Sequence, residues 1–328
     1  MTTNHGVHYL DVQDADAIFL YYENGNKSYV ILIDAGNIGD SDIIKQHLLD
    51  NFGTTTIDLA VCTHPDADHM GGFFGLLKDR ALCIKEFWLL SPEDAEASRY
   101  TYNNYLSDPT PAANFDHPTD PDSKNLISLA KEKCWYVYNV FQGHCHPEIP
   151  LRVLGPTKEF YYPLSKEILE KNVVPEEDET SKYEDVGDWR MEQAKSSIDN
   201  EPDDDSPTNA GSIILLFEPG NGQKFLLLGD ANRAAICDVL SNNSNLAGCI
   251  VKVPHHGSKH NLNSTIIDKL APTCAIISAK GTKKHPSRGV VHCLSKHCDV
   301  FSTHVGGNLV YQKSFKGKPA EPLKRKQN

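Results

Sequence analysis

A short strand that runs directly into a cluster of metal-ligand residue types is the feature that most constrains this fold. The largely apolar segment 57–62 is typical of a strand buried on both faces. The residues that come next include four ligand types, namely His64, Asp66, Asp68 and His69. Open α/β folds place ligand sites where a strand ends and a helix begins, and imidazoles and carboxylates bind divalent metal ions. A plain polar loop with a helix cap from Asp66 or Asp68 is the alternative, but so many ligand types in one short stretch favour a metal site.

Strands and helices alternate along most of the chain, which indicates an α/β fold. Runs of β-branched and aromatic residues predict the strands, and one-sided apolar periodicity predicts the helices. The expected strands are 8–12, 17–22, 29–33, 57–62, 135–141, 151–154, 212–218, 224–228, 249–253, 274–279 and 299–304, and the expected helices are 41–53, 123–134, 232–241, 264–270 and 287–296. This order fits two sheets flanked by helices, and it also fits a doubly wound parallel sheet.

The length of 328 residues allows one large domain or two small ones, and we expect a single domain over residues 1–328. Residues 91–122 are rich in Pro, Asp, Asn and Tyr, which predicts a surface insertion. Residues 175–208 combine acidic charge with few apolar side chains. Such a segment buries too little to offset its ordering entropy, so a mobile acidic loop is expected there. The basic tail 314–328 is expected to fray.

The overall charge and the cysteines exclude some classes of protein. A formal net charge of −12 argues against a protein that holds long nucleic acid over its whole surface, because that mode depends on neutralising phosphates. The nine cysteines are scattered, without a C-x-x-C pair. They are expected to be reduced, buried thiols rather than disulfides or a zinc site. No signal peptide and no apolar run of membrane-spanning length is visible, so a cytoplasmic protein without membrane contact is expected.

One stretch of this acidic chain is basic. Residues 251–298 contain eight lysines and arginines but only one acidic residue, Asp268. An acidic protein with one basic stretch can use it for an anionic ligand. A solvated basic face explains the same pattern equally well.

The segment 63–72 resembles the H-x-H-x-D-H signature of the metallo-β-lactamase superfamily, with Asp66 in place of the second histidine. This variant is similar to the hydrolase domain of ComEC-type competence DNA-uptake proteins and their stand-alone soluble relatives. Further segments resemble that family in the same order: Tyr9–Val12 with Asp16-Ala17, Leu32–Gly36, Val153–Pro156, Asn209–Ser212, Leu228–Asp230, Val253–Ser258 and His285-Pro286. The resemblance covers roughly residues 8–312. Gln13-Asp14-Ala15 departs from the family's G-Q-G, and His144 and His146 are imprecise candidates for a mid-chain ligand.

The resemblance implies a four-layer αββα sandwich with two divalent metal ions, Zn²⁺ or Mn²⁺, at one edge. In this pattern His64 and Asp66 hold the first metal, Asp68 and His69 hold the second, and Asp230 bridges them. The sequence does not decide between His255 and His256, of which one ligates metal or contacts substrate. We assign His255 to the metals, and Asp68, His256 and His285 to catalysis. Asp34 is expected to orient one of the metal-binding side chains without binding the metal itself.

The implied chemistry is hydrolysis, because a bound divalent metal lowers the pKa of water to about 7 and supplies hydroxide at neutral pH. A phosphodiesterase or nuclease is the first interpretation, acting on nucleic acid or a small phosphodiester. Its expected substrate contacts are Lys252, Ser258, Lys259, Lys283 and Lys284. Two alternatives remain. One is hydrolysis of an acyl bond in a lactone, thioester or lactam. The other is a regulatory subunit that docks a protein partner through the acidic loop.

Overall fold

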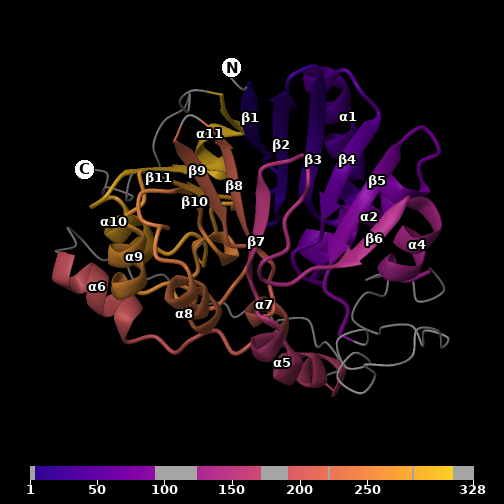
Figure 1. The fold of residues 1–328 in the computed structure, drawn as a ribbon. Coiled ribbons are helices and arrows are strands. Elements are labelled where there is room, and N and C mark those ends of the chain that lie inside the picture. Colours follow the sequence, from indigo (N-terminus) through magenta and orange to yellow (C-terminus); the bar gives the residue numbers. More distant parts are fainter. Residues whose placement is uncertain (1–3, 93–123, 171–190, 221, 283, 313–328) are drawn as a thin grey trace.

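The computed structural model describes residues 4–92, 124–170, 191–220, 222–282 and 284–312 of the chain, which form two β-sheets with helices outside them (Figure 1). The expected insertion 91–122, apart from its first two residues, and the expected frayed tail 314–328 lie outside these ranges. Sheet A has the strand order β13-β1-β2-β3-β4-β5-β6, and sheet B has the order β12-β11-β10-β9-β8-β7. Two separate sheets exclude the doubly wound alternative.

The strands have the following bounds. Sheet A consists of β1 (His5–Tyr9), β2 (Ala17–Asn24), β3 (Lys27–Ala35), β4 (Thr56–Val61), β5 (Cys83–Leu89), β6 (Tyr136–Asn139) and β13 (Leu309–Tyr311). Sheet B consists of β7 (Leu151–Gly155), β8 (Ile214–Gly220), β9 (Gln223–Leu227), β10 (Ile250–Lys252), β11 (Cys274–Ile277) and β12 (Asp299–Ser302). Strands β3, β4, β5 and β6 are parallel, as are β9, β10, β11 and β12.

The helices lie mainly on the outer faces of the two sheets (Figure 1). They are η1 (Ile38–Asp40), α1 (Ser41–Phe52), α2 (Ala67–Lys78), α4 (Leu126–Lys133), α5 (Lys158–Glu170), α6 (Met191–Asp199), α7 (Pro207–Ala210), α8 (Arg233–Asn242), η3 (His255–Gly257), α9 (Ser264–Leu270), α10 (Arg288–Leu294) and α11 (Thr303–Gly306). Helices α1, α2 and α4 cover sheet A, and α8, α9 and α10 cover sheet B. None of the helices in the described ranges combines the length and the apolar character needed to cross a membrane.

Buried side chains form three clusters that fill the three spaces between four layers. In β9, Phe225 and Leu227 point into the cluster between the sheets, and Leu226 points into the cluster beneath the outer helices. Alternate side chains of a strand point to opposite faces, so a strand apolar at every position is buried on both sides. Phe73 of α2 and Phe87 of β5 belong to the third cluster, on the outer face of sheet A. The predicted αββα sandwich is therefore confirmed.

Two predicted segments differ from the structure. The first strand runs over His5–Tyr9 instead of 8–12, because it pairs antiparallel with β2, whose first residue Ala17 lies level with Leu10. Residues 191–208 of the expected mobile loop 175–208 include helix α6 and the start of α7, and residues 175–190 lie outside the described residues. Helix α6 packs on α10 and buries Ala194 and Ile198, which lie one helical turn apart. Composition underestimated the order of this segment, because the burial of two apolar side chains on one face is enough to hold helix α6 against α10.

A buried histidine pair makes the stability of the fold depend on pH. His8 Nδ1 lies 2.9 Å from His47 Nε2 beneath α1. Burial, and then the proximity of His47, lowers the pKa of His8 from 6.5 to about 4. The unfolded chain therefore takes up this proton first as the pH falls. The contribution is fully present above about pH 6.5 and is lost as the pH falls toward 4.

We expect wild-type protein to lose about 2 kcal/mol of unfolding free energy through His8 between pH 7.5 and pH 5. The variant His8→Phe fits among the rings of Phe19, His47 and Phe52 and removes this titration. Urea unfolding of both proteins at the two pH values measures the difference. Equal pH dependence in both proteins would show that His8 does not titrate as described.

Candidate functional site

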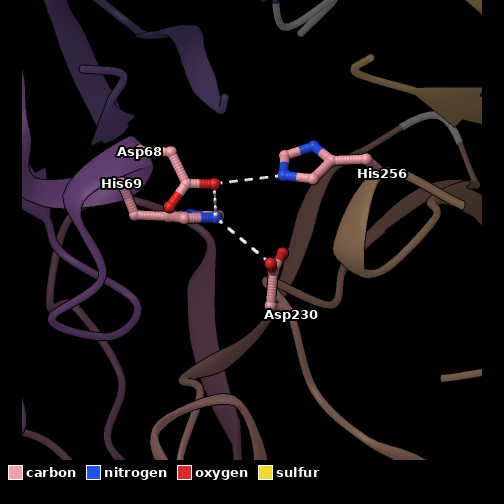
Figure 2. Close-up of side chains that lie close together, drawn as sticks. All are labelled: Asp68, His69, Asp230 and His256. Carbon is pink, nitrogen blue, oxygen red and sulfur yellow. Dashed lines mark hydrogen bonds and ion pairs between the residues drawn. The ribbon is translucent and has the colours of Figure 1, made fainter. Parts of the chain in front are cut away.

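The candidate site is built at the edge of the sandwich where parallel strands of both sheets end. Asp34 closes β3 and His64 follows β4 in sheet A, and Asp230 follows β9 and His256 follows β10 in sheet B. The carboxyl ends of parallel strands lie at one edge of a sheet, where open α/β folds place their ligands. Figure 2 shows Asp68, at the start of α2, pointing toward Asp230 and His256 across the gap between the two halves.

Helix α2 brings Asp68 and His69 to this edge in its first turn. The glycine pair behind them permits a close approach of α2 to the end of β3. A Cβ atom on Gly72 would lie 2.0 Å from the carbonyl oxygen of Ala35, and one on Gly71 would lie 2.5 Å from a backbone nitrogen. No side chain fits at such distances. The glycines that follow the ligand residues in the sequence therefore have a packing role.

Hydrogen bonds behind the site fix the orientation of two histidines. His69 Nδ1 donates to Asp34 Oδ2 at 2.8 Å. Thr63 Oγ1 donates to the same carboxylate at 2.8 Å and accepts from His64 Nδ1 at 3.0 Å. Both rings then carry their lone pair on Nε2. These two Nε2 atoms are buried without a hydrogen-bond partner among the described residues. Metal-bound histidines commonly show this arrangement, in which a carboxylate or hydroxyl behind the ring fixes the tautomer.

Four side chains, Asp68, His69, Asp230 and His256, form what we call the four-residue group. One ligand atom of each lies within 4.8 Å of the others. His256 Nδ1 donates to the carbonyl oxygen of Ser278 at 2.9 Å, and its Nε2 donates to Asp68 Oδ2 at 3.1 Å. Nε2 is therefore the ring nitrogen that would bind a metal ion, after giving up its hydrogen. His69 Nε2 lies 3.3 Å from Asp230 Oδ2 and 3.6 Å from Asp68 Oδ2.

The donor set of the four-residue group fits a divalent metal ion. Nitrogens of two imidazoles and oxygens of two carboxylates converge in a buried site, and such an arrangement is costly unless a cation lies among them. Burial lowers the pKa of His69, but the carboxylates of Asp230, Asp68 and Asp34 outweigh it and raise that pKa well above its usual value. The site therefore has a strong preference for positive charge.

The other predicted metal ligands lie beside this group. His64 Nε2 is 3.7 Å from Asp66 Oδ2, and the rings of His64 and His69 are 4.1 Å apart. His64 and Asp66 do not belong to the four-residue group, as expected if they hold a different metal. A second group of close ligand atoms joins His69 to Asp34 and to Asp16.

The structure separates the two members of the histidine pair after β10, between which the sequence did not decide. His256, expected to act in catalysis, is the member within the four-residue group, and His255, expected to hold metal, is not. Both residues have positive φ angles, 46° and 51°, a backbone conformation that is uncommon outside glycine. This local turn decides which ring enters the group. His285 lies next to the pair, with its ring stacked 5.5 Å from that of His255.

The predicted substrate lysines do not form one surface. The prediction that Lys252 contacts substrate is wrong. Its side chain is 1% exposed and its ammonium pairs with Asp16, so it cannot reach a substrate phosphate. Ser258 is also buried, and its hydroxyl accepts the backbone N–H of His260. Lys259 is exposed and paired with Glu201 at 2.8 Å. Lys284 is exposed, and Lys283 lies outside the described residues.

The mid-chain candidates His144 and His146 lie against Trp88, with ring centroids at 4.7 and 6.2 Å, and neither belongs to a group of ligand atoms. Two residues near the site were not expected from the sequence. Asp16 is buried beside Lys252, and its neighbouring motif gave the only signal for it. Asp204 contacts His255. The sequence gave no signal for this contact, because Asp204 lies in a run of acidic residues.

Asp34 offers a test of the hydrogen bonds behind the site. Its φ angle is 57°, which asparagine tolerates, so Asp34→Asn keeps the backbone while it removes the charge. We expect Zn²⁺ affinity to fall about 10- to 100-fold, the usual cost of losing a carboxylate that orients a metal-bound histidine. Competition with a chromophoric chelator measures this. Asp58→Asn, in the neighbouring strand β4, is the matched control, and equal affinity in both variants would contradict the role of Asp34.

Comparisons with known proteins give one family match and several partial similarities. Residues 15–140 match the family model described as the Metallo-beta-lactamase superfamily. Over 115 residues, or 34% of this chain, the sequence is 32% identical to ComE operon protein 3 of Bacillus subtilis (strain 168), and the match spans 15% of that protein. A diphosphatase of the PhnP family has a similar structure, with a TM-score of 0.44, 11% identity, and coverage of 96% of this chain and 100% of that one. The metallo-beta-lactamase fold protein YhfI from Bacillus subtilis gives a TM-score of 0.43, 9% identity, and coverage of 94% and 99%. Identities this low do not indicate a substrate.

Proposed function

We propose that this chain is a metal-dependent hydrolase, and specifically a phosphodiesterase or nuclease; the match of residues 15–140 to the Metallo-beta-lactamase superfamily supports the hydrolase part. The observation that carries the proposal is the four-residue group, in which ligand atoms of two histidines and two aspartates converge at a buried strand edge. The resemblance of the sequence motifs to ComEC-type DNA-uptake proteins favours a phosphodiester substrate; the match to ComE operon protein 3 itself covers 15% of that protein.

The residues present would hold two divalent ions. The four-residue group is the first site, and His64 with Asp66 is the second, with Asp230 between them. Two such ions, when bound, supply activated water and stabilise charge on the attacking and leaving oxygens. Three of the proposed ligands are carboxylates, which are harder ligands than imidazole, so Mn²⁺ is as acceptable as Zn²⁺.

The protein's own groups orient this chemistry. Asp34 holds His69 directly and His64 through Thr63, and the carbonyl of Ser278 holds His256. Asp68, near the surface of the group, is the proposed residue that positions the attacking water. His285 is the proposed contact to the leaving oxygen, because it lies beside the histidine pair without being a member of the four-residue group. Burial, and then His255, lower the pKa of His285 to about 3, so its ring is neutral at pH 7 and acts as a hydrogen-bonding group.

Metal content and phosphodiesterase activity test the proposal together. Elemental analysis of purified protein is expected to give about two metal equivalents. Bis-p-nitrophenyl phosphate should be cleaved with Zn²⁺ or Mn²⁺, and Asp68→Ala should abolish cleavage. Asp42→Ala, at an exposed position of α1, is the matched control and should leave the rate unchanged. Metal without phosphodiester cleavage would favour an acyl substrate, and a protein that binds no metal after reconstitution would refute the proposal.

A further inference from the structure

Asp204 is a buried carboxylate that reaches the histidine pair from a separate segment of the chain. It lies between α6 and α7, and its side chain is 7% exposed. Three polar side chains meet its Oδ2 atom: His255 Nδ1 at 3.1 Å, Asn209 Nδ2 at 2.8 Å and Asn261 Nδ2 at 3.0 Å. Burial raises the pKa of Asp204, but these hydrogen bonds, that of His255 foremost, lower it to about 2. The carboxylate is therefore ionised at neutral pH.

The segment that carries Asp204 is firmly attached to the rest of the fold. Arg233, at the start of α8, donates to the carbonyl oxygens of Ile198, Glu201 and Lys259. Asp203 accepts the backbone N–H of Arg233 at 2.9 Å. The segment is thus tied both to the loop after β9 and to the loop after β10. The position of Asp204 is consequently set by the same loops that carry the site.

Asp204 and Asn261 together determine the tautomer of His255. Asn261 is fully buried, and its Nδ2 donates to Asp204 and to the carbonyl oxygens of Asp230 and Ala231. These contacts fix its amide, so its Oδ1, 3.1 Å from His255 Nδ1, is an acceptor. His255 Nδ1 therefore faces two acceptors at 3.1 Å, the carboxylate and the amide oxygen. Asn209 Nδ2 lies farther away, at 3.5 Å, and makes its shorter hydrogen bond, of 2.8 Å, to Asp204. A ring nitrogen in that position carries the hydrogen, which leaves Nε2 with the lone pair.

His255 is placed to use that lone pair in the site. Its ring lies 5.9 Å from the ring of His256, which belongs to the four-residue group, and 5.5 Å from the ring of His285. The backbone N–H of His255 donates to Asp230 Oδ1 at 3.1 Å. The ring therefore stands against the four-residue group without belonging to it.

We infer that Asp204 is a positioning residue that holds His255 as the Nδ1–H tautomer, so that His255 presents an acceptor nitrogen at the active site. The expected effect on kcat rests on the proposed function. The tautomer of His255 rests on the hydrogen bonds alone. Asp204 acts only through His255 and does not touch the reacting groups. Asparagine at position 204 can donate as well as accept, so Asn261 Oδ1 is then the one fixed acceptor at His255 Nδ1, and the preference for the Nδ1–H tautomer weakens.

The test compares Asp204→Asn with Asp205→Asn, which makes the same change of charge at an exposed neighbouring position. In the Zn²⁺-loaded full-length protein, we expect Asp204→Asn to lower kcat about 10- to 100-fold, with KM and metal content near those of wild type. Asp205→Asn should behave as wild type. His255→Gln should reproduce the loss, and adding Asp204→Asn to it should cost nothing more, because residues that act through one another are not additive.

A spectroscopic measurement separates this inference from the proposed function. Nitrogen-15 NMR of histidine-labelled protein, with His255→Gln for assignment, reports which ring nitrogen of His255 carries the hydrogen. Wild type and Asp205→Asn should show Nδ1–H, and Asp204→Asn should show a shift toward Nε2–H. An unchanged tautomer in Asp204→Asn, or multiplicative losses in the double variant, would overturn the inference. If wild type cleaves no phosphodiester, the proposed function fails, and the NMR comparison still decides the role of Asp204.

Discussion

Asp230→Ala is expected to remove most of the bound metal and to lower hydrolytic activity by more than ~100-fold, since residues behind a metal ligand alone account for 10- to 100-fold. Asp230 lies 3.3 Å from His69 Nε2 and accepts the backbone N–H of His255, so it connects the ligands of sheet A with the loop after β10. No other carboxylate of the four-residue group comes from sheet B. Its loss therefore affects both proposed metal positions.

Elemental analysis after gel filtration and the rate with bis-p-nitrophenyl phosphate measure the effect. Asp42→Ala again provides the control for the loss of one aspartate. The variant Asp230→Asn keeps the shape and the backbone hydrogen bond but removes the charge, and it should retain part of the metal. If Asp230→Ala binds metal as tightly as wild type, Asp230 is not a ligand.

The second large effect concerns the buried ion pair behind the site. Lys252 and Asp16 are both 1% exposed. Lys252 also lies 3.3 Å from the carbonyl oxygen of Gly229 and 3.8 Å from Asp230 Oδ1. Removing one partner of a buried pair leaves an uncompensated charge, which typically costs 3–5 kcal/mol. We therefore expect Lys252→Met to lower the unfolding free energy of the metal-free protein by about 3–5 kcal/mol.

Urea unfolding of the metal-free protein measures this, with Lys27→Met as the matched control. Lys27 forms an exposed pair with Glu148, and exposed pairs contribute less than about 1 kcal/mol. Adding Asp16→Asn to Lys252→Met should recover part of the loss, because no unpaired charge then remains. Equal losses for Lys252→Met and Lys27→Met would show that the buried pair does not stabilise the fold.

The family and the fold could be predicted because both depend on local patterns. Metal ligands such as His64 and His69 lie close together in the sequence, so their spacing alone identified them. Both residues lie within the segment 15–140 that matches the family model, and their role as ligands stays a prediction. Strands that are apolar at every position, as in β11, indicated sheets buried on both faces, and the family resemblance implied the four layers.

Predictions failed where a residue's role depends on its neighbours in space. Lys252 follows apolar residues in a basic stretch, and the sequence cannot show that Asp16, 236 residues away, lies against it. Asp204 sits in a run of three aspartates that looks like solvated charge, yet two buried asparagines and a histidine surround it.

The sequence by itself determined which chemistry the chain can carry, because ligand types, their spacing and the flanking glycines are local properties. Tertiary structure alone decided which of His255 and His256 enters the four-residue group, since that depends on the left-handed turn after β10. It also decided which charges are paired, because pairing requires residues distant in the chain to meet. Local spacing can name candidate ligands, but only packing fixes where their lone pairs point.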